Sequence, residues 1–281
     1  IKGSGAVVYG GLEYDMTVES MVTDAEAYPE VRDRDLTFAF SHDVDGIRVA
    51  GDDIPYLAGS KTEAENVAQV YNGGGDDADK ARLVEGQEGT ETSFKALSGK
   101  QKKVLHIATH GFYFNEAEAS GMELFGRRDG TKMRGEDRSL MRSGLLMAGA
   151  GNRYMGEVLP DGLEDGILTS QEIANTDLTG LDLCVLSACQ TAEGDIRSEG
   201  VFGLQRGFKK AGANTLLMSL WKVDDDATCL LMTEFYRNWI SKGETKQQAL
   251  EHARLAVRSH TERGWDHPRY WASFILLDAL D

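Results

Sequence analysis

The sequence predicts an α/β protein in which helices cover both faces of a mostly parallel sheet. Three observations support this prediction. Short apolar runs alternate with helical patterns along the chain, and most of these runs are continuous rather than alternately polar and apolar. The length of 281 residues is enough for one large domain with a substantial core. Continuous apolar runs are typical of strands that are buried on both faces of a sheet.

Six apolar runs are predicted to be strands. They are Ala6–Tyr9, Leu83–Val84, Val104–Ala108, Leu183–Ser187, Thr215–Leu220 and Phe274–Leu277. Helical segments separate most of them, and this order predicts a three-layer sandwich of helices, sheet and helices.

The predicted helices carry recognisable start and stop signals. Capping-box spacing occurs twice, at Ser60 with Glu63 and at Thr169 with Glu172, and Thr90 is a third candidate N-cap. One helical face carries Val201, Leu204, Phe208 and Ala211, and Gly212 follows as a C-terminal stop. Two long amphipathic patterns span residues 227–242 and 245–263.

Two stretches fit neither pattern. Residues 24–54 are acidic and predicted to be irregular, apart from a candidate hairpin at 36–50. Residues 115–138 combine high charge, several glycines and no apolar period, which predicts a long mobile loop.

Composition excludes several classes of function. The formal net charge is −16, from 30 Lys and Arg against 46 Asp and Glu, and it argues against binding to nucleic acid or to anionic membranes. No stretch approaches the ~20 apolar residues of a membrane helix. The acidic runs lack EF-hand spacing, so we predict neither a metal nor a cofactor. Three cysteines without a CxxC pair indicate a reducing compartment, for which we predict the cytoplasm.

A histidine and a cysteine stand where two predicted strands end. His110 closes the run that begins at Val104, and Cys189 closes the run that begins at Leu183. Ligands of open α/β sheets bind at the carboxyl ends of the strands, so neighbouring strands would bring imidazole and thiol together. An imidazole activates a thiol by taking its proton, and the N–H groups of Gly111 and Cys189 are candidate oxyanion donors. Taken singly, a strand-end cysteine or histidine is more often structural, as we expect for Cys184 and Cys229.

Nine motifs, in order along most of the chain, resemble the CHAT peptidases, which are caspase-like domains usually joined to tetratricopeptide repeats. The motifs are Tyr9–Asp15, Tyr56–Val67, Gly89–Leu97, Val104–Tyr113, Arg142–Ala150, Asp165–Leu178, Leu183–Asp195, Gly200–Thr228 and His267–Leu276. The resemblance implies a caspase-like three-layer α/β/α sandwich with His110 as the catalytic histidine and Cys189 as the nucleophile. It implies a cysteine endopeptidase that cleaves a partner protein.

The resemblance also bears on domains and partners. Residues 1–281 are predicted to be one caspase-like CHAT domain. Further N-terminal sequence of the domain, and a regulatory tetratricopeptide-repeat region or partner chain, are expected outside it. The alternative is a caspase-like module that only docks partners, without catalysis.

Specificity is the least determined property. Ser187 stands two residues before Cys189, where some related enzymes that cut after basic residues carry an acid. The charge must then come from Asp225, or failing that Asp224, with Asp226 expected to cap the following helix. Trp221 is a candidate pocket wall, or a core residue. A preference for an apolar P1 residue remains the alternative, and under a basic preference the 115–138 loop, with five Lys and Arg, is a candidate for self-cleavage.

Overall fold

The computed structural model describes residues 3–32, 54–73, 79–113, 140–155, 159–160, 162–190, 198–221 and 224–278. The candidate hairpin at 36–50 and the predicted loop at 115–138 lie outside these residues.

The described strands form one eight-stranded sheet whose main order is β2-β1-β3-β6-β7-β8, with β4 and β5 attached through β3. The strands are β1 (Ala6–Leu12), β2 (Ala81–Gly86), β3 (Val104–Tyr113), β4 (Ser143–Leu146), β5 (Ile167–Thr169), β6 (Leu183–Gln190), β7 (Thr215–Ser219) and β8 (Phe274–Leu277). Pairing is parallel from β2 to β7, and it is antiparallel for β4, β5 and β8. The mostly parallel sheet of the sequence prediction is therefore confirmed.

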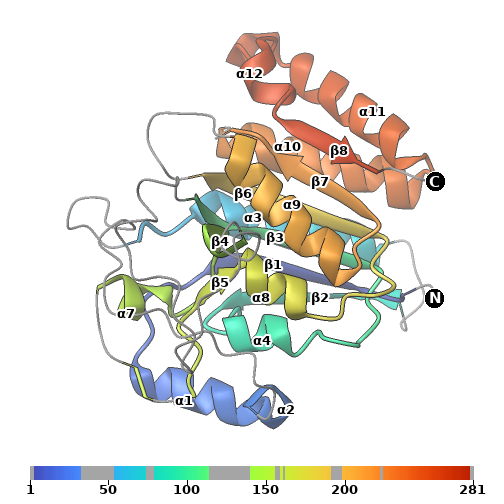
Figure 1. Cartoon of the computed structure of the whole chain (residues 1–281). Coiled ribbons are helices and arrows are strands. Elements are labelled where there is room, and N and C mark those ends of the chain that lie inside the picture. Colours follow the sequence, from blue (N-terminus) through green and yellow to red (C-terminus); the bar gives the residue numbers. More distant parts are fainter. Residues whose placement is uncertain are drawn as a thin grey trace.

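Helices cover both faces of this sheet (Figure 1). The helices are α1 (Val18–Ala27), α2 (Pro29–Arg32), α3 (Ala58–Asn72), α4 (Glu91–Lys95), α7 (Ala150–Tyr154), α8 (Ser170–Asn175), α9 (Ser198–Ala211), α10 (Asp225–Tyr236), α11 (Lys246–Arg258) and α12 (Pro268–Trp271). A π-helical turn at Arg237–Ser241 continues α10, and a 3₁₀ turn at Thr261–Arg263 follows α11. Helices α4, α8 and α9 pack against one apolar cluster, and α3, α10 and α11 pack against the other.

Successive residues of each central strand belong to these two clusters in turn. In β6, Cys184 and Leu186 face the α8–α9 layer, whereas Leu183 and Val185 face the α3–α10 layer. The strands thus bury apolar side chains on both faces, which explains why their sequence is continuously apolar. The three-layer prediction is confirmed.

The sequence prediction missed several elements, including α7 and α12. Residues 24–32 belong to α1 and α2 rather than to an irregular segment; the Thr17 hydroxyl caps α1 at Ser20 N–H, and Met21 and Ala25 are buried. Strands β4 and β5 were also missed, because runs of four and three residues carry too little periodic signal.

The predicted capping box at the start of α3 is wrong. Helix α3 begins at Ala58 and has no side-chain cap. The Ser60 hydroxyl donates to the Leu57 carbonyl oxygen at 2.7 Å and accepts from Gly11 N–H at 3.0 Å. The Glu63 side chain points into the protein interior instead. The capping box predicted at Thr169 and the N-cap predicted at Thr90 are both confirmed.

None of the helices in the described ranges combines the length and the apolar character that crossing a lipid bilayer requires.

Candidate functional site

His110 of β3 and Cys189 of β6 lie directly opposite one another. The two strands pair in unbroken parallel register from Val104 with Leu183 to Gly111 with Gln190, and His110 is the partner of Cys189. Neighbouring strands are about 4.8 Å apart, which is within reach of an imidazole and a thiol. The structure describes the backbone of Cys189, and the thiol itself lies outside the described part. The predicted juxtaposition of the two strands is therefore present.

The His110 ring is held from α3's side of the sheet. Its Nε2 lies 2.7 Å from the Pro55 carbonyl oxygen, and the residue is 3% exposed. Because a carbonyl oxygen can only accept, Nε2 carries the proton, and in the neutral ring Nδ1 holds the lone pair. The contact thus selects the tautomer in which Nδ1 can act as a base. Sequence reasoning did not identify Pro55.

Tyr14 also packs against this histidine. The two ring centroids are 5.2 Å apart, with planes inclined by 46°. The Tyr14 hydroxyl lies 2.9 Å from the Thr109 hydroxyl, which donates to the Leu146 carbonyl oxygen at 2.5 Å, so Tyr14 donates to Thr109. Burial raises the pKa of Tyr14 to about 12, and the phenol stays protonated. Tyr14 therefore gives His110 a fixed, neutral wall.

Strand β3 does not end at His110, contrary to the sequence prediction. It continues to Tyr113 and pairs with β4, where Gly111 lies opposite Leu145. Gly111 is thus a strand residue between β4 and β6 rather than the first residue of a loop. On one side β3 pairs first with β1 and then with β4. The sequence of β3 did not predict this change, because its residues are buried along the whole strand.

Ser187 is partly exposed and makes a contact that the sequence did not reveal. Its hydroxyl donates to Oε2 of Glu63 at 3.0 Å. The other oxygen of that carboxylate, Oε1, lies 3.0 Å from Nε2 of His106. His106 Nδ1 in turn lies 3.3 Å from the Tyr236 hydroxyl, whose pKa burial raises. A buried polar chain therefore runs from α10 through α3 to β6, close to position 189.

The three aspartates after β7 have separate roles. Asp224 is the N-cap of α10 and accepts from Ala227 N–H at 3.1 Å. Asp226, expected to be that cap, is instead 75% exposed and pairs with Arg263 at 3.0 Å. The prediction was wrong by two residues because α10 begins at Asp225. Asp225 is exposed and packs directly on Gly59 at the start of α3.

Trp221 lies just beyond the end of β7 and is partly buried. Its indole N–H donates to the Arg269 carbonyl oxygen at 2.9 Å, and its ring packs against the α3–α10 core. It therefore contributes to that core.

The CHAT domain family matches residues 13–279, which is nearly the whole chain. The chain belongs to the CHAT domain family. Among curated proteins it is similar to tetratricopeptide repeat protein 28 of Homo sapiens, 32% identical over 115 residues, and to its counterpart of Mus musculus, 31% identical over 115 residues. Each match covers 41% of this chain and 4% of the relative, so the matched segment is a small part of either relative's length. The mostly parallel α/β sheet fits the caspase-like fold of the family.

The other two cysteines of this CHAT domain are structural. Cys184 is fully buried, and burial holds its pKa well above the usual range. Cys229 of α10 is half-buried; burial raises its pKa, and its sulfur accepts from the Asn66 amide at 3.2 Å. Neither thiol has the low pKa of a nucleophile.

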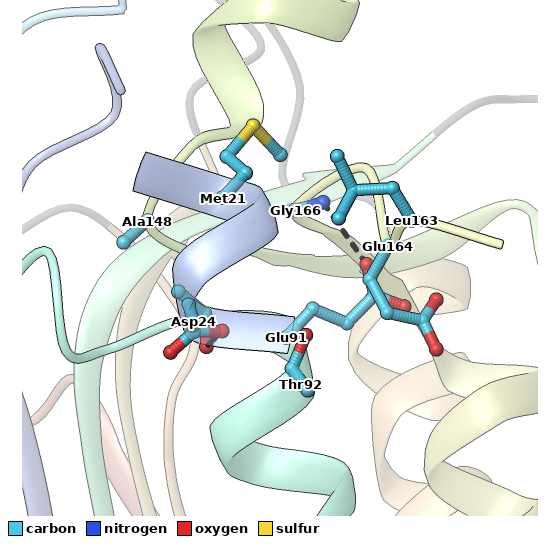
Figure 2. Close-up of a pocket in the computed structure, with 9 residues that line it drawn as sticks. Met21, Asp24, Glu91, Thr92, Ala148, Leu163, Glu164 and Gly166 are labelled. Atoms are coloured by element: carbon cyan, nitrogen blue, oxygen red, sulfur yellow. Dashed lines mark hydrogen bonds between the residues drawn. The ribbon is translucent and has the colours of Figure 1, made fainter. Parts of the chain in front are cut away.

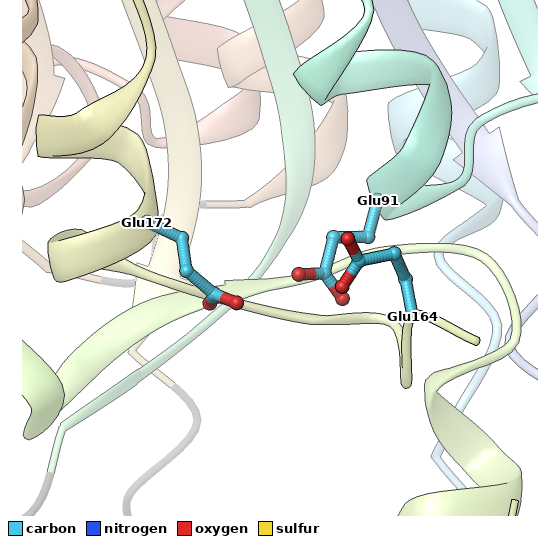
Figure 3. Close-up of side chains that lie close together, drawn as sticks. All are labelled: Glu91, Glu164 and Glu172. Carbon is cyan, nitrogen blue, oxygen red and sulfur yellow. The ribbon is translucent and has the colours of Figure 1, made fainter. Parts of the chain in front are cut away.

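A second buried polar cluster lies on the α4–α8 side of the CHAT domain. Glu91, Glu164 and Glu172 turn their carboxylates toward one another (Figure 3). Lys95 Nζ lies among them, 2.7 Å from Glu91, 2.7 Å from Glu164 and 3.1 Å from Glu172. An ammonium thus occupies the place that a cation would take. The cluster joins α4, α8 and the segment before β5.

Burial and crowding shift the pKa values of this cluster. Burial and the neighbouring Glu91 raise the pKa of Glu164 and of Glu172 to about 8, against the opposing effect of Lys95. Burial disfavours the Lys95 ammonium, but the three carboxylates outweigh it and raise the pKa of Lys95 well above its usual value.

A cavity of about 10 Å³ adjoins the cluster, which is room for one water molecule (Figure 2). Asp24, Glu91 and Glu164 line it, and Glu91 accepts from Gly166 N–H at 3.0 Å. Asp24 also accepts from the Thr90 hydroxyl at 2.7 Å, which ties α1 to the cap of α4. The cavity is too small for a substrate, and we assign the cluster to stability.

Proposed function

We propose that this CHAT domain is a cysteine endopeptidase whose nucleophile is Cys189 and whose general base is His110. One observation carries the proposal: the two residues are register partners on adjacent parallel strands. The hydrogen bond from His110 Nε2 to Pro55 supports it, because that bond leaves Nδ1 as the basic nitrogen. The substrate is a segment of a partner protein.

The reaction follows from these roles. His110 Nδ1 takes the Cys189 proton, and the thiolate attacks the scissile carbonyl carbon. The N–H groups of Gly111 and Cys189 are the proposed donors to the oxyanion. The imidazolium then protonates the leaving amine, the C–N bond breaks, and an acyl-enzyme remains. A water molecule, deprotonated by Nδ1, hydrolyses the thioester and restores the thiol.

We place the P1 side chain on the α3–α10 side of the sheet, past Ser187 and toward Trp221 and Asp225. Asp224, Asp225 and Asp226 are all exposed; Asp224 is engaged as the α10 cap and Asp226 pairs with Arg263, so we choose Asp225. A basic P1 residue suits these acids. The names of the two relatives support a tetratricopeptide-repeat region, in the same protein or in a partner chain, as the regulatory element.

Thiol labelling tests the dyad. A peptidyl chloromethyl ketone should alkylate Cys189 selectively, and mass spectrometry of the peptides identifies the site. His110→Ala should abolish this selective labelling. The matched control is Cys229→Ala, which removes a half-buried thiol elsewhere and should leave the labelling rate unchanged. Equal, slow labelling of all three thiols would instead support a docking module without catalysis.

A further inference from the structure

The Glu63 carboxylate is buried in the α3–sheet interface close to the proposed nucleophile. The residue is 4% exposed. It accepts hydrogen bonds with both oxygens, from His106 Nε2 and from the Ser187 hydroxyl, each at 3.0 Å. It has no Lys or Arg partner among the residues that the structure describes. A carboxylate held in this way brings a negative charge to a region of low dielectric.

The proton positions in this chain leave the charge on Glu63. Within the described part of the chain, the Tyr236 hydroxyl has His106 Nδ1 as its hydrogen-bond partner, at 3.3 Å. Nε2 donates to the Glu63 carboxylate, and in the tautomer whose Nδ1 holds a lone pair, Tyr236 donates to Nδ1. Both oxygens of the Glu63 carboxylate accept hydrogen bonds in this arrangement. No lysine or arginine of the described residues lies against this carboxylate.

Ser187 lies between the buried Glu63 carboxylate and the protein surface. It is partly exposed, whereas Glu63 behind it is not. Because its proton points to Glu63, the lone pairs of its oxygen are what it offers to a ligand. Its register partner on β3 is Ala108, whose side chain is small. Positions 187 and 189 share one face of β6, since successive strand residues alternate.

We propose that the Ser187 hydroxyl, with the Glu63 carboxylate behind it, forms the acceptor end of the P1 pocket and selects a Lys or Arg side chain. This inference rests on the proposed peptidase function and adds its specificity residue. An ammonium or guanidinium donates to the Ser187 oxygen and places a positive charge near the Glu63 carboxylate. A carboxylate side chain would meet a like charge, and an apolar one would leave the charge uncompensated. Asp225, exposed on α10, stands outside as a rim residue.

The test separates charge from shape. Four peptidyl chloromethyl ketones that differ only at P1 carry Arg, citrulline, Lys or norleucine, and the second-order rate of Cys189 alkylation is measured for each. Citrulline matches Arg in length, norleucine is Lys without its terminal nitrogen, and both lack the charge. In the wild type we expect Arg to react at least about 30-fold faster than citrulline, a factor typical of a charge-assisted contact.

Glu63→Gln should reduce the Arg-to-citrulline ratio to below about 3-fold while citrulline keeps its own rate, because the amide can still bond to Ser187. The matched control is Glu65→Gln, the same change two residues along α3 at a half-exposed position, which should keep the wild-type ratio. Ser187→Ala is a second test of the Arg-to-citrulline ratio. It leaves the carboxylate in place and should also lower the ratio.

The outcomes distinguish this inference from the proposed function. If no ketone alkylates Cys189 in the wild type, the peptidase function fails. If Cys189 is alkylated but citrulline and norleucine equal Arg and Lys, the function stands and the Glu63 pocket is overturned. The pocket is also overturned if Glu63→Gln slows all four probes equally, which marks a structural role, or if Asp225→Asn removes the ratio and Glu63→Gln does not.

Discussion

The Pro55 carbonyl oxygen accepts a 2.7 Å hydrogen bond from His110 Nε2, although 55 positions separate the two residues in sequence. The bond links the segment before α3 to the middle of β3. It determines which ring nitrogen is basic, and it does so with a backbone atom that no side-chain substitution can remove.

The ring of Tyr14 is expected to be needed for His110, and its hydroxyl is not. Tyr14→Ala removes the ring 5.2 Å from the imidazole and should slow Cys189 alkylation by about tenfold or more, since small displacements of a catalytic group are costly. Tyr14→Phe keeps the ring and should stay within about threefold. Equal losses in both variants would contradict a packing role. The alkylation rate, measured with the Arg ketone, decides between them.

The dyad should behave as a unit. Cys189→Ala and His110→Ala should each lower peptide cleavage at least about 10³-fold, because nucleophile and base act together. The double variant should be no worse than either single one. Circular dichroism checks that the fold is kept. Cleavage that survives Cys189→Ala would remove this cysteine as the nucleophile.

The Glu91–Lys95–Glu164–Glu172 cluster should make stability fall as pH rises. The pKa values of Glu164 and Glu172 are raised by burial from about 4.5 to about 8, so the folded state holds more protons than the unfolded state between these values. Their contribution is complete below pH 4.5 and is lost as pH rises through about 8. The urea midpoint should be lower at pH 8.5 than at pH 6. Glu164→Gln should reduce that difference, whereas Glu88→Gln, at an exposed site, should not.

Lys95 should be essential for the same cluster. Lys95→Met removes the ammonium that contacts all three buried glutamate side chains and should cost about 3–5 kcal/mol of unfolding free energy at neutral pH. Lys61→Met, in a half-exposed ion pair on α3, should change it by less than about 1 kcal/mol. Urea denaturation of the two variants measures both. A loss for Lys95→Met no larger than the control would mean that the cluster does not depend on its ammonium.

Asp224 caps α10, whereas the sequence predicted Asp226 as the cap, and the two substitutions should differ in their effect on stability. Asp224→Ala removes the acceptor for Ala227 N–H and should cost about 0.5–2 kcal/mol. Asp226→Ala breaks an exposed pair with Arg263 and should cost about 0–1 kcal/mol. The thermal midpoints of the two variants give the order, and a larger loss for Asp226→Ala would contradict the cap assignment.

The sequence by itself determined the three layers and the principal strands, and it assigned His110 and Cys189 to the C-terminal parts of two of them. Continuous apolar runs and helical periods are local patterns, and parallel strands bring their carboxyl ends to one edge whatever the side chains are. The tertiary structure alone decided the partners: Pro55 for His110, Glu63 for Ser187, and Asp224 rather than Asp226 for the α10 cap. Glu63 shows the reason. Its spacing from Ser60 suggested a local cap, but Ser187, 124 positions away, offered a buried carboxylate the hydrogen bond that burial requires.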